Sequence, residues 1–209
     1  MLQKGGAAAL HRDLQRSGAA YVAFLEWAED FDKTASKAAP FFDSLACGDL
    51  AAARSIAERV AGSVHSDQEY EDDFLYIKWL MGRFVLGRDF TDLSAMLTRY
   101  EALLDGADDA RFLICQAFDR SDPALFDTAL CTLIETRADD YASGTEGDQI
   151  IEEDWATEGK VFVEAVALLR LAASLGFELE SDYMFVPSLV LVTQAASFGS
   201  GTWATSDAT

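Results

Sequence analysis

The densest group of potentially reactive side chains is an acidic segment, DDYASGTEGDQIIEEDWATEGK, at positions 139–160. Its carboxylates before the first base, Lys160, are Asp139, Asp140, Glu146, Asp148, Glu152, Glu153, Asp154 and Glu158. Carboxylates at this density could ligate a metal ion, carry out acid–base catalysis, form a solvated loop, or face a strongly basic partner. The spacing of the other residues distinguishes among these possibilities.

Metal-binding patterns are absent from the sequence. A calcium loop requires oxygen ligands at alternating positions, a glycine at the turn and a closing glutamate, and the acidic segment lacks that spacing. A di-metal carboxylate bundle requires Glu-x-x-His on its helices. Neither His11 nor His65 follows a glutamate at that offset, and zinc lacks a ligand set altogether. We therefore expect no metal.

Catalytic motifs are absent as well. The nucleophile motif G-x-S-x-G does not occur, and neither phosphate-binding glycine motif is present, so we expect no cofactor. Glycosidase chemistry requires one carboxylic acid held in an apolar pocket. Only Glu164 lies deep in an apolar helical pattern, and we expect it to be a rim residue or to form an ion pair, with Lys160 nearby. We therefore expect no enzymatic activity.

A second acidic cluster, SDQEYEDD at positions 66–73, precedes a predicted helix that contains Phe74. Ser66 and Glu69 have the spacing of a capping box. The other acids of the cluster stand where the helix dipole is positive. Local helix physics therefore explains this cluster, which is our second choice for a binding surface.

The net charge restricts the class of partner. Sixteen Lys and Arg residues against thirty-six Asp and Glu residues give a formal net charge of −20. This charge repels nucleic-acid phosphates and anionic membrane surfaces, and it attracts cationic partners. The arginines are scattered singly along the chain. We therefore expect neither nucleic acid nor a membrane as a partner.

Two interpretations of the acidic segment remain: a solvated loop, or an electrostatic docking surface for a cationic protein. Carboxylates around exposed aromatic anchors are typical of tight binding surfaces, although aromatic residues such as Tyr141, Trp155 and Tyr183 could equally cap the core. For the docking interpretation, the predicted partner-binding residues are Asp139, Asp140, Tyr141, Glu146, Asp148, Glu152, Glu153, Asp154 and Trp155.

The cysteines and the chain start predict a cytoplasmic protein. Cys47, Cys115 and Cys131 are odd in number and widely spaced, which is typical of small core residues in a reducing compartment. The N-terminal Gly/Ala run is too weak for a signal peptide. The most apolar stretch is interrupted by Glu164 and Arg170, so we expect no membrane span.

Helical periodicity dominates the chain and supplies the elements that must position these groups. A first long helix should bury one face, after a break at Gly18; that face comprises Tyr21, Phe24, Leu25, Ala28 and Phe31. Asp49 should cap a helix that ends at Gly62, and Asp122 should cap another that has Pro123 at its first position. A helix from about 154 to 175 is apolar nearly all round, which predicts a central position.

The predicted fold is all-α, with about eight or nine helices. Short connections favour a single-domain bundle or a stack of antiparallel helical hairpins. We expect one domain over residues 1–196 and a flexible tail over 197–209. The segment GDLAAARSIAERV is similar to a tetratricopeptide repeat helix. A helical-repeat adaptor that binds a peptide is therefore an alternative, although no further copies follow at constant spacing.

Three segments of the second half resemble the immunity protein 49 family of bacterial polymorphic toxin systems. They are DDFLYIKWLMGRF, SDPALFDTALCTLIETRADDY and VEAVALLRLAASLGFELESDYMFVPSLV. The resemblance covers about residues 50–195 and leaves 1–48 outside. It implies an all-helical cytoplasmic protein that neutralises a toxin, encoded beside it, by direct binding. It carries no residue-level signature for toxin contact. An acidic inhibitor would suit a basic, nuclease-like toxin.

Overall fold

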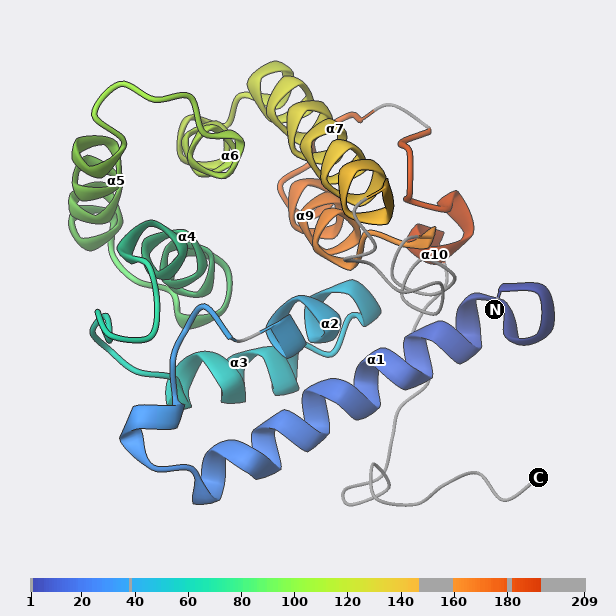
Figure 1. Ribbon diagram of the computed structural model, residues 1–209, viewed down its shortest axis with the longest axis horizontal. Coiled ribbons are helices and arrows are strands. Elements are labelled where there is room, and N and C mark those ends of the chain that lie inside the picture. The colour runs from blue at the N-terminus through green and yellow to red at the C-terminus, as the bar shows by residue number, and fades with distance from the viewer. Residues whose placement is uncertain (1, 38, 147–159, 180–181, 193–209) are drawn as a thin grey trace.

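The computed structural model describes residues 2–37, 39–146, 160–179 and 182–192 (Figure 1). Within these ranges the chain forms nine α-helices, a 3-10 turn and a π-helical turn. The only β-type pairing that the described residues make is an isolated bridge between Tyr183 and Val186. The predicted all-α fold is therefore confirmed.

The described helices lie between Leu2 and Val192. In chain order they are α1 (Leu2–Trp27), α2 (Ala39–Cys47), α3 (Leu50–Arg59), α4 (Glu71–Met81), α5 (Phe90–Leu104), α6 (Ala110–Arg120), α7 (Pro123–Glu146), α9 (Val163–Ser174) and α10 (Ser188–Val192). The 3-10 turn η1 (Asp30–Asp32) follows α1, and the π-helical turn η2 (Gly82–Leu86) continues α4.

Aspartates begin four of these helices. Asp49, Asp89, Asp109 and Asp122 each accept a hydrogen bond from a backbone N–H in the first turn, at 3.0, 2.9, 2.6 and 3.0 Å respectively. Each carboxylate thereby satisfies one N–H that has no partner within its helix. The predicted caps Asp49 and Asp122, with Pro123 at the first position of α7, are confirmed.

Helix α1 differs from the prediction at Gly18, which lies inside the helix and does not break it. The non-helical residue is Gly6, with φ 61° and ψ 178°. At Gly18 the helix approaches α2 so closely that an added Cβ would lie 2.2 Å from Ser44 Oγ. Gly18 therefore serves close packing of α1 against α2.

The buried face predicted for the first helix is also wrong in part. Leu25 is buried and Tyr21 is half-buried, but Phe24 and Phe31 are exposed. Phe31 lies beyond the end of α1, in η1. Because the helix ends at Trp27, the helical period no longer determines which way Phe31 faces.

Helix α9 occupies the middle of the molecule, as predicted from its apolar sequence. Its buried residues are Ala165, Val166, Ala167, Leu168, Leu169, Leu171 and Ala172. It begins at Val163, and not near residue 154, because Val161 and Phe162 are not helical. The Phe162 backbone N–H instead donates to the Phe185 carbonyl at 2.8 Å. Residues 154–159 lie outside the described ranges.

The arrangement in space is a closed bundle. Helix α1 runs along one side beneath α2 and α3, and α2 packs on α9 from the other end of the sequence (Figure 1). Repeats in a solenoid contact only their neighbours in sequence. Here α2 contacts α9, which is distant in sequence, so the helices form a bundle and not a solenoid. One cluster of buried apolar side chains extends from Ala7 to Val190. The predicted boundary at 196 and the tail 197–209 lie outside the described ranges.

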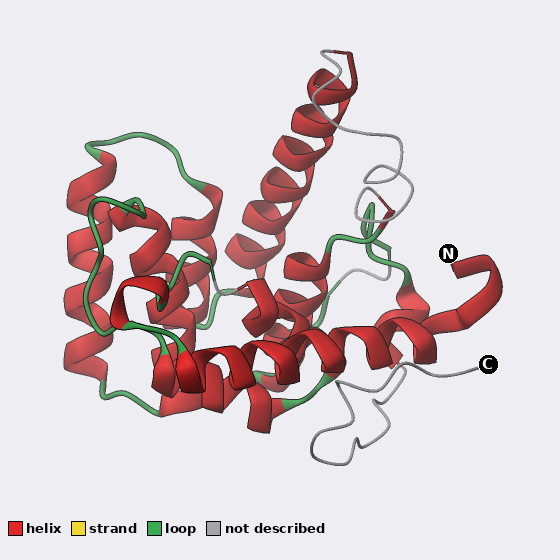
Figure 2. Cartoon of the chain, turned by 60° about the horizontal axis from the view of Figure 1, so that its bottom comes forward, coloured by secondary structure: helices red, strands yellow, loops and turns green. Residues whose placement is uncertain are grey.

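Two further features concern the ends and the surface of the bundle. The Val190 carbonyl accepts hydrogen bonds from His11 Nε2 at 3.0 Å and from Arg170 Nη2 at 2.9 Å, which ties α1 and α9 to α10. Helix α7 projects away from the other helices at its C-terminal end (Figure 2).

Among the described helices, none is both long and apolar enough to span a membrane. Cys47 and Cys115 are buried and form no disulfide with any described residue.

Candidate functional site

The start of the predicted acidic segment is helical. Asp139, Asp140, Tyr141 and Glu146 lie in the last turns of α7, so this part of the segment is not the loop that its composition suggested. Asp139 and Asp140 are exposed and make no ion pair with any described residue. The C-terminal end of a helix disfavours negative charge, so these carboxylates do not stabilise α7. The other predicted residues, Asp148, Glu152, Glu153, Asp154 and Trp155, lie outside the described ranges.

Tyr141 is a half-buried packing residue. The Arg137 guanidinium lies 4.5 Å from the centre of the Tyr141 ring and 4.5 Å from that of Phe162. Arg137 Nη2 also donates to the Tyr141 hydroxyl at 3.1 Å. These contacts hold the end of α7 against the residue that precedes α9. Tyr183 is similarly engaged, because its hydroxyl donates to Asp127. Both tyrosines therefore match the alternative interpretation, in which they cap the core.

The predicted capping box of Ser66 and Glu69 is wrong. Helix α4 begins at Glu71 with Tyr70 as its N-cap, and no side chain caps it. The Glu69 side chain is buried and accepts hydrogen bonds from the backbone N–H groups of Ser36, at 2.9 Å, and His65, at 3.2 Å. Glu69 therefore fixes the loop before α4 to the segment before α2, which is distant in sequence.

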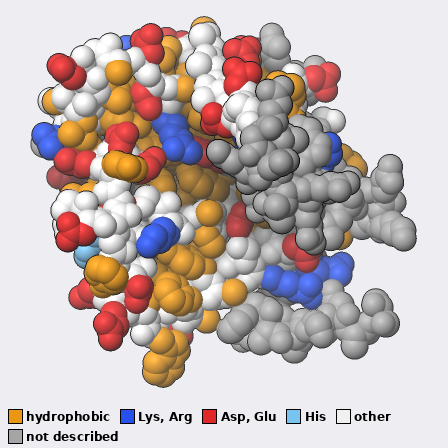
Figure 3. Space-filling view, in the orientation of Figure 1, with side chains coloured by type: hydrophobic (Ala, Val, Ile, Leu, Met, Phe, Trp, Pro, Cys, Tyr) orange, Lys and Arg blue, Asp and Glu red, His pale blue; other side chains and the backbone are white. Residues whose placement is uncertain are grey.

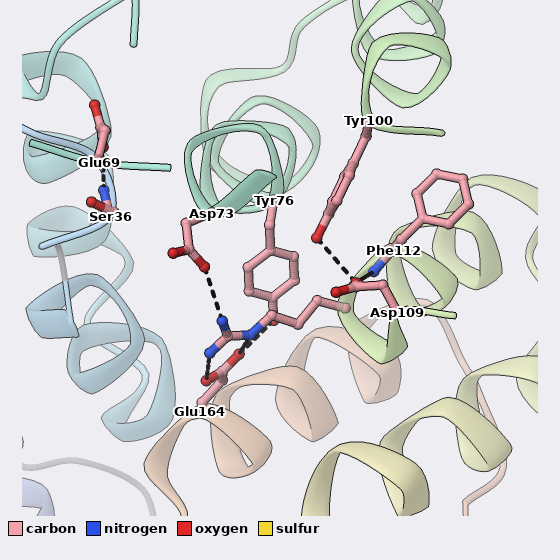
Figure 4. A network of polar contacts seen from close by, with 9 residues as sticks. Ser36, Glu69, Asp73, Tyr76, Tyr100, Asp109, Phe112 and Glu164 are labelled. Carbon is pink, nitrogen blue, oxygen red and sulfur yellow. Dashed lines mark hydrogen bonds and ion pairs between the residues drawn. The ribbon is translucent and has the colours of Figure 1, made fainter. Parts of the chain in front are cut away.

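A polar cluster joins α4, α6 and α9 around Arg111 (Figure 4). The guanidinium forms a bidentate pair with Glu164, with both distances at 3.0 Å, and Nη1 lies 3.1 Å from Asp73 Oδ1. Its carbon lies 5.2 Å from the centre of the Tyr76 ring. The Tyr76 hydroxyl donates to Glu164 at 2.8 Å. The predicted ion pair of Glu164 is confirmed, but its partner is Arg111 and not Lys160.

The charges of this cluster influence one another's protonation. Burial, reinforced by the charge of Glu164, raises the pKa of Tyr76 well above its usual value. Burial also raises the pKa of Asp73, and the charge of Arg111 opposes that rise. Burial lowers the pKa of Arg111, but the charge and hydrogen bonds of Glu164, with the charges of Tyr76 and Asp73, together outweigh burial and raise the pKa overall. Arg111 therefore stays charged and holds Glu164 as its counterion.

A hollow of about 240 Å³ lies beside this cluster. It is lined by Ser36, Ala39, Phe42, Asp73, Tyr76, Ile77, Arg111 and Glu164. Acid–base catalysis by two carboxylates requires one of them to be a neutral acid. Here both carboxylates are bonded to one guanidinium, so each is already engaged in an ion pair. We interpret the Arg111 cluster as the polar junction of three helices.

A different kind of surface lies where α1 ends. Trp27 is 88 % exposed, Phe31 is 62 % exposed and Phe24 is 47 % exposed. Phe24 and Trp27 are neighbours on the helix surface because they are three residues apart. The Phe24 ring also stacks on Tyr21, with centroids 5.6 Å apart. We name these three exposed aromatics, Phe24, Trp27 and Phe31, the Trp27 patch.

Carboxylates surround the Trp27 patch. Glu26, Glu29, Asp30 and Asp32 are all exposed, and Figure 3 shows acidic and hydrophobic side chains mixed at the lower left, where α1 ends. Lys33 lies 3.0 Å from Asp30. Within the described part of the chain, the carboxylates of Glu26, Glu29 and Asp32 pair with no cation. This rim therefore carries uncompensated negative charge.

A hollow of about 220 Å³ extends the patch beside Phe31. It is lined by Phe31, Val64, His65, Ser66, Asp67 and Gln68. The Trp27 patch is not among the predicted binding residues, but Ser66, Asp67 and Gln68 of this hollow belong to the second acidic cluster. The signal of the patch is present in EWAEDFD at positions 26–32, where acids alternate with aromatics. The helical period instead assigned Phe24 and Phe31 to a buried face.

The described residues contain no group of three or more His, Cys, Asp or Glu placed to hold a metal ion. Comparison with protein-family models, with curated proteins and with solved structures finds no match to this chain. The surface chemistry of the molecule is therefore the feature that bears on its function.

Proposed function

We propose that this protein binds a basic protein toxin and neutralises it, as an immunity protein does. The observation that carries the proposal is the net charge of −20 together with exposed carboxylates that no described cation neutralises. They occur at the end of α1 and at the end of α7. Uncompensated charge at two exposed sites stabilises neither helix, so a role in recognition accounts for it better than a role in folding.

A basic toxin is the partner that this charge favours. Opposite charge accelerates association by steering the two proteins together. Toxins that cleave nucleic acids need cationic surfaces to bind phosphates, and an acidic protein can cover such a surface. The segments within 50–195 resemble the immunity protein 49 family, and this resemblance also implies a protein that binds and neutralises a toxin. The cytoplasm, where a producing cell would need protection, is the proposed location.

The alternative function, a helical-repeat adaptor, has less support. An adaptor of that kind presents a groove along a stack of repeats. Here α2 packs on α9 and closes the bundle. No observation on the described residues favours the adaptor.

The test begins with the gene beside the one that encodes this protein. If it encodes a toxin domain, co-expression of the two should restore growth, and the purified proteins should form a stable complex. Association should slow markedly as salt rises, because the Debye length shrinks from about 10 Å at 0.1 M to about 3 Å at 1 M. Absence of both rescue and binding would refute the proposal.

A charge variant tests the predicted acidic segment directly. Changing Asp148, Glu152, Glu153 and Asp154 together to Asn or Gln should lower the association rate if this segment docks the toxin. Thermal unfolding of this variant, compared with that of wild type, checks that the substitutions leave the fold intact. Association at the wild-type rate in low salt would show that these four carboxylates do not dock the toxin.

A further inference from the structure

We infer that the Trp27 patch is a docking face, and that its occupant is a basic protein that presents arginine side chains around an apolar protrusion. The inference deepens the proposed function and rests on it for the identity of the partner as a toxin. The docking face comprises the Trp27 patch and the surrounding rim of Glu26, Glu29, Asp30 and Asp32.

The aromatic part of the patch is suited to binding. Single exposed apolar residues are common on protein surfaces, whereas a contiguous group rimmed by polar residues marks an interaction site. Tryptophan is among the residues that contribute most at protein interfaces. Trp27 exposes 88 % of its surface, so almost all of its apolar area is available to a partner.

The charge of the rim selects a basic occupant. Four carboxylates and one base, Lys33, leave a local net charge of −3 (1 − 4). A second copy of this chain would bring two such rims together, and their repulsion opposes self-association. An anionic membrane or a nucleic acid would be repelled in the same way. A cationic protein gains from both the rim and the aromatic rings.

Arginine is favoured over lysine by chemistry that the molecule already uses. Arg111 lies between the carboxylates of Asp73 and Glu164 and above the Tyr76 ring. Arg137 contacts the rings of Tyr141 and Phe162. A guanidinium can stack on an aromatic ring while its edge bonds to a carboxylate. The Trp27 patch supplies rings and carboxylates at the surface, and a partner's arginine would complete that combination.

The hollow beside Phe31 is lined mostly by polar groups, and with the carboxylate of Asp67 in its lining it offers space for a cationic side chain of the partner. The loop that forms it is held in place. Ala61 N–H donates to the Lys33 carbonyl at 2.7 Å, and Glu69 accepts from the N–H groups of Ser36 and His65. A surface that is ordered before binding loses less entropy when the partner arrives.

The first experiment uses two labelled peptides of equal charge, one of four Arg-Leu repeats and one of four Lys-Ser repeats. Fluorescence anisotropy measures their binding to the full-length chain. Wild type should bind the Arg-Leu peptide about tenfold more tightly than the Lys-Ser peptide, since leucine packs on the rings and a guanidinium stacks on them better than an ammonium does. Trp27→Ala/Phe31→Ala should abolish this preference.

A matched variant separates the patch from general charge attraction. Asp139→Asn/Asp140→Asn removes two exposed carboxylates at the end of α7 and should leave the peptide preference unchanged. The inference is overturned if wild type shows no preference, if Trp27→Ala/Phe31→Ala retains it, or if the α7 variant loses it equally. A wild-type dimer in sedimentation that Trp27→Ala/Phe31→Ala converts to monomer would also overturn it, by identifying a second copy as the occupant.

The second experiment uses the toxin domain encoded by the adjacent gene. Trp27→Ala/Phe31→Ala should weaken the complex by about a hundredfold, as expected when two interface anchors are removed. Both residues are exposed, so circular dichroism should show an unchanged fold. If this variant protects cells as well as wild type does, the docking face is wrong and the proposed function stands. If the peptides require the patch but wild type gives no protection, the docking face stands and the toxin assignment fails.

Discussion

At the junction of α4, α6 and α9 the carboxylates of Asp73 and Glu164 share one guanidinium, whereas at the end of α1 three of four rim carboxylates pair with no cation in the described chain. The first group is partly buried and links three helices. The second group is exposed and surrounds aromatic side chains. The same residue types therefore have different roles, and the difference lies in whether the fold supplies a cation.

With sixteen bases for thirty-six acids, this protein has few cations to distribute. Arg111 contacts two carboxylates and the Tyr76 ring. Arg111 lies where a carboxylate without a cation would cost the most stability, because the site is partly buried. The exposed rim at the end of α1 stays charged at little cost, because water and salt screen it. The net charge of this protein therefore indicates a binding surface only after the acids that pair with a cation inside the fold, Asp73 and Glu164, have been excluded.

Removing the cation from the internal group should have the largest effect. Arg111→Met should lower the free energy of unfolding by about 2 kcal/mol, because Glu164 would lose its partner while 12 % exposed. This value lies below that for a fully buried pair, since Arg111 is itself partly exposed. Urea unfolding at pH 7 measures the change.

The matched control is Arg99→Met. Arg99 also forms a bidentate pair, with Glu71 at 2.7 Å, but on the surface. The melting temperature of the Arg99→Met variant should remain close to that of wild type. If both variants lose equal stability, the distinction between internal and exposed carboxylates is wrong.

A buried lysine extends the comparison to a cation. Lys78 is 3 % exposed, and burial together with the charge of Arg88 lowers its pKa from 10.5 to about 8. The unfolded chain therefore binds the proton more tightly, so this site costs stability at pH 7 and costs less as the pH rises from 8 toward 10.5. Lys78→Met should raise the free energy of unfolding by on the order of 2 kcal/mol at pH 7. The gain over wild type should shrink by pH 9.5, and a constant gain would contradict this explanation.

His11 should show a smaller effect of the same sign, at lower pH. Burial and the charge of Arg170 lower the pKa of His11 below 6.5. The unfolded state therefore takes up a proton first, and stability falls as the pH falls below 6.5. His11→Gln keeps a donor for the Val190 carbonyl and cannot titrate. Its stability should decline less than that of wild type between pH 7 and pH 5.5, as thermal unfolding in matched buffers can show.

Neutralising the exposed rim should have the smallest effect on stability. Glu26→Gln/Glu29→Gln/Asp32→Asn should leave the melting temperature unchanged or slightly higher, because it removes mutual repulsion and no ion pair within the described chain. Association with the basic toxin should slow by about tenfold at low salt. A clear loss of stability would show that these carboxylates serve the fold, and the comparison would then fail.

Local signals explain the parts of the fold that the sequence predicts. Asp49 and Asp122 act on N–H groups two or three residues away, so their caps are visible in the sequence. The central position of α9 is visible because its apolar residues cover nearly the whole helix. These features need no knowledge of distant segments.

Distant contacts explain the failures. Gly18 is conformationally suited to end a helix, but its role is set by Ser44 on α2. Glu69 has the spacing of a cap, yet it bonds to Ser36, thirty-three positions away. Glu164 pairs with Arg111, fifty-three positions away, in place of the nearby Lys160. Of the candidate surfaces, the sequence indicated the acids of α7 by their density and missed the Trp27 patch, since exposure at a helix end depends on what packs beside it.

The packing of α2 on α9 has a consequence for synthesis on the ribosome. Residues Phe41 and Leu45 of α2 are buried in the finished protein, but α9 begins only at Val163. At about 5–20 residues per second, α9 emerges on the order of ten seconds after α2. During that interval the nascent chain must expose the apolar face of α2 to chaperones or to other chains. The strong negative charge of the chain would then keep neighbouring nascent copies apart.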